Sequence, residues 1–200
     1  MNDLHLVMHG LAIKKHGTPE DVAGVLGLDL DTVRETLAKL VAARRAVEAQ
    51  GRYLLSPAAR MLLDADYARF YEDLRADASF QAGYAGFERL NTTLKQLITD
   101  WQTIPVRGER APNDHTDKEY DADIIDRLGD LHERAEEVLE KLAVALPRMA
   151  IYREKLEAAL EKAEKGAIAW VSDAKIESYH TVWFELHEDL LRLMRRERSE

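Results

Sequence analysis

The sequence predicts a mostly α-helical protein in two parts, a small domain over residues 1–60 and a helical domain over residues 61–200. Apolar residues recur every three to four positions over most of the chain, which is typical of helices that bury one face. Only residues 46–55 change to an extended pattern. Charge divides the chain at the same place. Residues 1–60 hold eight Lys/Arg and seven Asp/Glu, whereas the remaining 140 hold twenty and thirty, so the acidity lies in the second part.

Three helices are expected before the extended segment. The first ends at Gly17, a residue that favours a helix C-terminus. Thr18-Pro19 then supplies an N-cap and a favoured first position for a short second helix that ends at Gly27. Asp29 or Asp31 caps a third helix. Two short helices joined by a tight glycine-containing turn are typical of a helix-turn-helix.

A two-stranded hairpin should follow the third helix. Residues 46–49 and 52–55 alternate as strands do, and Gln50-Gly51 between them suits a tight turn. Ser56-Pro57 repeats the cap and first-position pattern and opens the next helix. A small hairpin directly behind the third helix is a wing, so residues 1–60 are predicted to form a winged helix-turn-helix, three helices plus a β-hairpin wing.

The end of the hairpin carries a family resemblance. Leu55-Ser56-Pro57-Ala58-Ala59-Arg60 resembles the wing exit of MarR-type transcriptional regulators, which commonly show Leu-Thr-Pro-x-Gly-Arg there. This chain has Ser56 in place of Thr and Ala59 in place of Gly, and the resemblance covers less than a third of its length. It implies a DNA-binding transcriptional regulator that works in the cytoplasm.

From Pro57 onward only helices are expected, and together they should form a C-terminal helical bundle. The predicted helices cover about 57–76, 80–101, 117–146, a segment ending near Gly166, and about 172–196, with a loop over 103–116. In the helix over 117–146, apolar residues follow a 4-3-4-3 spacing typical of a bundle or coiled-coil seam. Such a seam invites another helix, and two DNA-binding heads reading neighbouring half-sites bind more strongly than one, so we expect a homodimer.

The third helix is the expected contact with double-stranded DNA, because an inserted helix presents its N-terminal half to base edges. Arginine suits guanine, threonine a thymine methyl group, and basic residues near a wing suit phosphates. Thr36 could add a contact. The alternative is that the winged helix serves as a protein-docking platform. The expected DNA-binding residues are Thr32, Arg34, Glu35, Lys39, Arg44, Arg45 and Arg52.

The last helix suggests a second site, for a small-molecule effector. His180 and His187 both fall on its apolar face, where an unpartnered polar group is costly. The predicted helix over 80–101 places Asn91 in its own apolar stripe. The alternative is a buried hydrogen-bonded network that fixes helix register. The effector-pocket candidates are Asn91, Trp101, Tyr179, His180, Trp183 and His187.

Other classes of function find little support in the sequence. His180 and His187 lie about 10 Å apart along a helix, too far for one metal ion, and there is no cysteine. No phosphate-binding loop, nucleophile motif or zinc-protease motif is present, so neither an enzyme nor a cofactor is expected. No apolar run would cross a membrane and no secretion signal is seen, so we expect a cytoplasmic protein. The helical half also faintly resembles regions that accompany phosphoenolpyruvate-utilising proteins, which implies as an alternative an accessory docking protein of such an enzyme.

Overall fold

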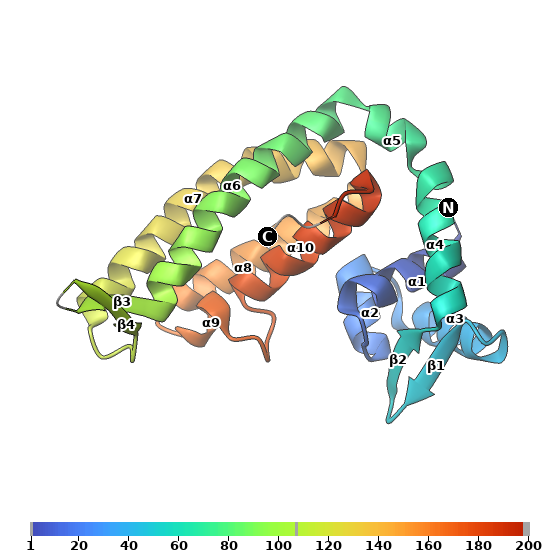
Figure 1. The fold of residues 1–200 in the computed structure, drawn as a ribbon, viewed down its shortest axis with the longest axis horizontal. Helices are drawn as coiled ribbons and strands as arrows, with labels where there is room; N and C mark the ends of the chain where they lie inside the picture. The colour runs from blue at the N-terminus through green and yellow to red at the C-terminus, as the bar shows by residue number, and fades with distance from the viewer. Residues whose placement is uncertain (1, 107, 198–200) are drawn as a thin grey trace. The chain divides into compact units, whose positions relative to one another are not determined.

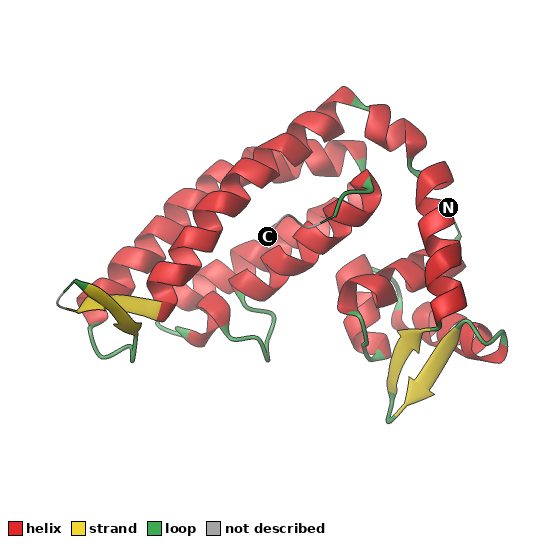
Figure 2. Cartoon of the chain, in the orientation of Figure 1, coloured by secondary structure: helices red, strands yellow, loops and turns green. Residues whose placement is uncertain are grey.

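The computed structural model of the chain describes residues 2–106 and 108–197, and it is mostly helical, as expected (Figures 1 and 2). It divides into two compact units. The first unit comprises residues 1–77 together with 185–200, and the second unit comprises residues 78–184. Compactness is a different criterion from function, so the proposed boundary after residue 60 stays a prediction.

The first unit contains the predicted three helices and hairpin. Its elements are α1 (Asp3–Lys14), α2 (Pro19–Leu26), α3 (Leu30–Ala42), β1 (Ala46–Ala49), β2 (Arg52–Leu55), α4 (Pro57–Phe70), α5 (Glu72–Ala76) and the later turns of α10 (Tyr179–Met194).

Local signals fix the ends of these elements. The Thr18 hydroxyl accepts from the Asp21 amide while the Asp21 carboxylate accepts from the Thr18 amide, which is a complete capping box for α2. Gly27 ends α2 with a φ of 67°, and Asp29 caps α3 by accepting from the Thr32 amide. Gln50 and Gly51 both have positive φ, as the two-residue turn between β1 and β2 requires.

The predicted helix over residues 57–76 is in fact two helices, broken at Tyr71. The Tyr71 ring is buried, and its hydroxyl hydrogen-bonds His5 Nε2 of α1 at 3.1 Å. The Arg75 guanidinium donates to the carbonyl oxygens of Tyr67 and Ala68 at 2.7 and 2.6 Å. A break in a helix leaves carbonyls without their usual amide donors, and Arg75 satisfies two of them. The contacts of Tyr71 and Arg75 therefore stabilise a break that the helical periodicity of the sequence does not predict.

A buried polar network crosses the core of the first unit. His9 is fully buried, and it hydrogen-bonds the Tyr67 hydroxyl through Nδ1 at 2.7 Å and Asp189 Oδ1 through Nε2 at 2.9 Å. Lys14 Nζ donates to Glu185 Oε1 at 2.6 Å nearby. Because buried polar groups are costly without partners, this network fixes the later turns of α10 on α1.

The second unit is a helical bundle with one small hairpin. Its elements are α6 (Ala78–Gln102), β3 (Thr103–Val106), β4 (Glu109–Pro112), α7 (Lys118–Ala145), the 3₁₀ turn η1 (Pro147–Met149), α8 (Ala150–Glu164), α9 (Ala169–Ser172) and the first turns of α10. Figure 1 shows α6 and α7 side by side, with the β3–β4 hairpin at one end of the pair. Within the described part of the chain, no helix combines the length and apolar character needed to span a membrane.

The apolar seam of α7 is covered by α6 of the same chain. Ile124, Leu128 and Leu131 are buried there. The helices approach closely where Gly83 faces Leu142 and Gly86 faces Val138. The seam had been expected to receive a helix from a second copy, and that argument for a homodimer is removed because the seam is already filled. The homodimer itself stays a prediction.

The loop expected over residues 103–116 is partly a hairpin. Thr103 pairs with Pro112 and Pro105 with Arg110, and both prolines are tolerated because a two-stranded sheet has only edge strands. Gly108 provides the turn with a φ of 90°. Arg110 ties the hairpin to α6 by donating to Asp100 at 2.9 Å. The long-range anchor explains why local sequence indicated a loop.

The close approach of α6 and α7 gives a prediction about two glycines. A methyl group added at Gly86 would lie 2.8 Å from Val138 Cγ2, whereas one added at Gly129 of α7 meets nothing closer than 3.8 Å. Gly86→Ala should therefore lower the free energy of unfolding by about 1–3 kcal/mol through overpacking. Gly129→Ala should raise it by up to about 1 kcal/mol, because alanine favours a helix. Urea unfolding followed by circular dichroism measures both. Equal effects of the two variants would contradict the packing described for Gly86.

Candidate functional site

The exposed face of α3 carries the residues expected to contact DNA. Arg34, Glu35 and Lys39 are exposed, and Thr32 is half-buried with its hydroxyl donating to Asp29 at 3.2 Å. Thr36, suggested as a further contact, is buried and faces the core instead. The face that α3 offers is thus short, polar and made mainly of charged side chains.

Each basic side chain expected on α3 and β2 is paired with an acid. Arg34 contacts Glu20 of α2 at 2.8 Å. Lys39 lies 3.9 Å from Glu35, and Arg52 lies 3.4 Å from Asp21. These exposed pairs are individually weak, because water and salt screen them.

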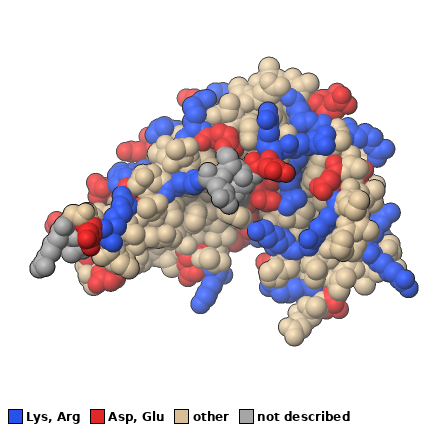
Figure 3. Space-filling model, in the orientation of Figure 1, with Lys and Arg blue, Asp and Glu red and all other residues tan. Residues whose placement is uncertain are grey.

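The turn between α3 and β1 contains two further arginines. Arg44 is exposed and has a φ of 55°, and Arg45 is half-buried. Among the described residues, neither side chain forms an ion pair. Figure 3 shows basic and acidic side chains intermixed over the visible face rather than gathered into one broad basic surface. Arg44 and Arg45 therefore offer positive charge to a phosphate at the end of α3.

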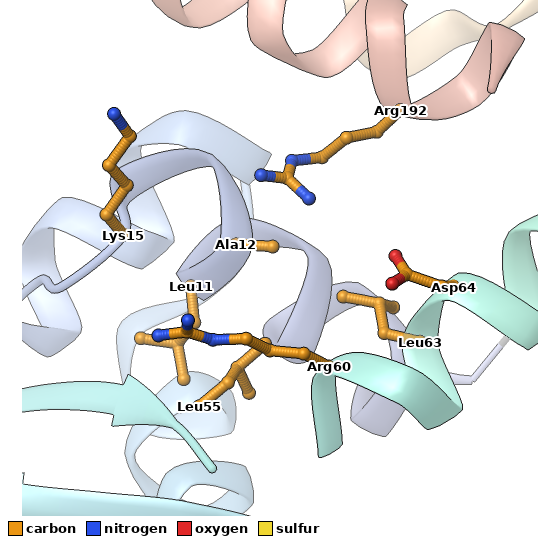
Figure 4. Close-up of a pocket in the computed structure, with 8 residues that line it drawn as sticks. All are labelled: Leu11, Ala12, Lys15, Leu55, Arg60, Leu63, Asp64 and Arg192. Carbon is orange, nitrogen blue, oxygen red and sulfur yellow. The ribbon is translucent and has the colours of Figure 1, made fainter. Parts of the chain in front are cut away.

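A hollow of about 340 Å³ lies within the first unit, beside the base of the hairpin (Figure 4). Its floor is apolar and its rim is mostly basic. Figure 4 shows Arg60 of α4 and Arg192 of α10 reaching toward the space over Leu11 and Leu55. Arg192 Nη2 donates to Glu188 at 2.6 Å, while its buried Nε has no hydrogen-bond partner among the described residues. The lining residues are Leu11, Ala12, Lys15, Leu55, Arg60, Leu63, Asp64 and Arg192.

Of the six candidates for the effector pocket, Asn91, Tyr179 and Trp183 are linked by contacts within the second unit. Asn91 Oδ1 accepts from Trp183 Nε1 at 3.1 Å, and Trp183 stacks on Tyr179. Trp101 instead contacts the His115 ring, with ring centroids 4.5 Å apart and the planes tilted by 37°. His187 is buried and belongs to the first unit.

His180, the remaining candidate, is half-buried, and burial lowers its pKa. None of the hollows described in this structure is lined by any of the six. Their role in effector binding stays a prediction, and so does the alternative of a buried hydrogen-bonded network.

A related pair lies between α7 and the start of α10. His132 Nδ1 hydrogen-bonds the Tyr179 hydroxyl at 3.2 Å. Burial raises the pKa of Tyr179. Burial also lowers the pKa of His132, although nearby acids, Glu136 first among them, oppose that shift. Both side chains are therefore held in their neutral forms near pH 7.

The sequence did not reveal a buried cluster around Asp121. His115 Nδ1 and Asn113 Nδ2 lie 3.0 and 2.9 Å from Asp121 Oδ1, and His115 adopts a φ of 59°. An acid in the first turn of a helix is ordinarily exposed near the positive end of the helix dipole, so Asp121 gave no sign of burial. Two members of this cluster, Asn113 and His115, lie in the run Asn113-Asp114-His115 just before α7. Across the described ranges, no group of three or more His, Asp or Glu side chains could hold a metal ion.

The pKa shift of His132 gives a prediction about acid stability. Its folded pKa is lowered below the ordinary value of 6.5, so under mildly acidic conditions the unfolded chain binds a proton that the folded chain does not. This histidine's contribution should therefore be lost as pH falls below about 6.5. His132→Gln should flatten the dependence of Tm on pH between 7.5 and 5.5, whereas His16→Gln, at an exposed position, should leave it unchanged. A dependence as steep in His132→Gln as in the parent chain would refute this assignment.

Comparison of the chain with protein-family models, with curated proteins and with solved structures finds no match. The resemblance carried by residues 55–60 accordingly stays a prediction. Function has to be argued from the side chains of this chain and their surroundings.

Proposed function

We propose that the chain is a DNA-binding transcriptional regulator in which residues 1–60, within the first unit, form a winged helix-turn-helix. The observation that carries the proposal is the order and capping of its elements. The short α2 ends at Leu26 and is capped by Gly27, α3 begins at Leu30 behind the Asp29 cap, and the β1–β2 hairpin follows. In this arrangement α3 enters a major groove and the hairpin contacts the backbone beside it.

The charges on α3 suit a contact that forms by exchange of partners. Arg34 can leave the exposed carboxylate of Glu20 for a phosphate or a guanine edge at small cost, since the pair is solvated. Arg44 and Arg45 need no such exchange and would supply phosphate contacts directly. Two copies, each reading a half-site, would compensate for the small number of contacts made by one head.

A second candidate is a protein-docking platform, and the same ion pairs favour it. Glu20, Asp31 and Glu35 place negative charge on the face that would approach DNA. A mixed-charge surface is better matched by another protein surface of complementary pattern than by a uniformly negative duplex. The two candidates differ in how binding responds to removal of an acid.

Replacing Glu20 separates the candidates. Glu20→Gln removes a negative charge and releases Arg34, so affinity for duplex DNA from the region upstream of its gene should rise several-fold. Arg34→Ala should weaken binding by about 1–3 kcal/mol if the side chain reads a base. The double change Arg44→Ala and Arg45→Ala should also reduce the salt dependence of binding. Fluorescence anisotropy over a salt series measures all three.

The matched control is Arg153→Ala, an exposed arginine of α8 in the second unit that should leave DNA affinity unchanged. Weaker DNA binding by Glu20→Gln, or no binding by the parent chain at low salt, would contradict the DNA proposal and favour docking.

The hollow of Figure 4 is a better candidate for an effector-binding site than the group of six residues predicted from the sequence. Its leucines would cover an apolar ligand body, and Arg60 with Arg192 would hold a carboxylate or phosphate. Its position beside Leu55, the last residue of β2, would let an occupant bias the hairpin.

The effector proposal predicts that an amphiphilic organic anion protects the chain from heat. Decanoate below its micellar concentration should raise Tm, because a ligand that binds only the folded state stabilises it. Decanol should do so less, since it lacks the charge. Arg60→Ala should reduce the difference between the two, while Arg153→Ala should preserve it. Equal stabilisation by decanoate and decanol in the parent chain would reject an anion site.

A further inference from the structure

A second hollow lies wholly within the second unit, between the first turns of α7 and the end of α8. Its volume is about 260 Å³. One wall is acidic and the rest is largely apolar. The lining residues are Lys118, Asp121, Ala122, Ile125, Asp126, Ala163, Glu164, Gly166 and Ile168.

Asp121, one of the lining residues, has one carboxylate oxygen without a hydrogen-bond partner among the described residues. The residue is 2% exposed, and its Oδ1 is held by His115 and Asn113. Its Oδ2 is buried and has no hydrogen-bond partner among the described residues. A carboxylate oxygen in that position ordinarily has a donor, because leaving it unpaired is costly. The described residues do not supply that donor, which points to a ligand that carries one.

The surrounding charges select a cation. Asp126 and Glu164 add two carboxylates to that of Asp121, against the single ammonium group of Lys118. Lys118 Nζ is directed to the His115 carbonyl oxygen at 2.7 Å. The C-terminal end of α8 lies at the same hollow, and the end of a helix is its negative pole.

The spacing of the acids selects an organic cation over a metal ion. Asp121 and Asp126 are five residues apart on one helix, about 7.5 Å along its axis, too far for two ligands of one ion. Ala122 and Ile125 lie between them in the sequence and line the same hollow. An alkyl chain with an ammonium group at each end matches this arrangement, in which apolar residues lie between two negatively charged groups.

We propose that this hollow binds a small alkyl diammonium ion. One ammonium group donates to Asp121 Oδ2, the carbon chain lies against Ala122, Ile125 and Ile168, and the second ammonium group lies near Asp126 and Glu164. The proposal does not depend on DNA binding, because every residue it uses belongs to the second unit.

The test is isothermal titration of the full chain with 1,4-diaminobutane. Saturable one-to-one binding is expected, with no binding of 1,4-butanediol, which has the same length and no charge. Asp121→Asn should weaken binding about tenfold or more, as expected for loss of a charge-assisted hydrogen bond. Asp130→Asn removes the same charge from an exposed position of α7 outside the hollow, and it should leave affinity within about twofold.

Two further variants protect the test against a folding defect in Asp121→Asn. Asp126 and Glu164 are exposed, so Asp126→Asn and Glu164→Gln should fold as the parent chain does and weaken binding several-fold. Unchanged affinity in both, equal weakening by Asp130→Asn, or equal binding of butanediol would overturn the proposal. Displacement of the diamine by magnesium at equal concentration would also overturn it, because the site would then be one for a metal ion.

Discussion

His9 and Asp189 meet in a place that solvent does not reach, with the Tyr67 hydroxyl on the other side of the imidazole ring. A buried carboxylate is tolerated only where a donor is held against it, and the donor here comes from a helix at the opposite end of the sequence. The first unit is therefore completed by the later turns of α10. The break at Tyr71 belongs to the same arrangement, because Arg75 donates to a carbonyl of α10, that of Leu193, at 3.2 Å as well as to α4.

How much of this fold the sequence reveals depends on the range of the interactions. The Thr18 cap and the Gln50-Gly51 turn act within four residues, and local pattern was enough to predict them, whereas it left Asp29 and Asp31 as equal candidates for the cap of α3. The break at Tyr71 depends on a hydrogen bond to His5, and the β3–β4 hairpin is held by an ion pair between Arg110 and Asp100. The local sequence pattern predicts neither contact. The apolar spacing of α7 correctly predicted that another helix packs along it. The spacing does not specify whether that helix belongs to the same chain or to a second copy.

The candidate sites divide in the same way. The exposed side chains of α3 follow from helical period and from the position of the caps, so their placement was predictable, apart from Thr36. The pairing of Arg34 with Glu20 depends on how α2 lies against α3, and that of Arg52 with Asp21 on how α2 lies against β2, and periodicity specifies neither. Both hollows are built from segments far apart in the sequence, and the burial of Asp121 depends on a loop that folds back over it. The polar residues in the sequence indicated where a site could lie. Which of these polar groups lack a hydrogen-bond partner follows only from how the helices pack.

The separation of His9 from Asp189 also sets an order of events during synthesis. The two residues are 180 positions apart, and at roughly 5–20 residues per second the second follows the first by on the order of ten seconds or more. During that interval α1 has already been made, while the carboxylate that its buried imidazole requires does not yet exist. The apolar face around His9 is then exposed to whatever else is present in the cell. A chaperone that recognises apolar helices would find its substrate in this interval, and slow codons late in the message would lengthen it.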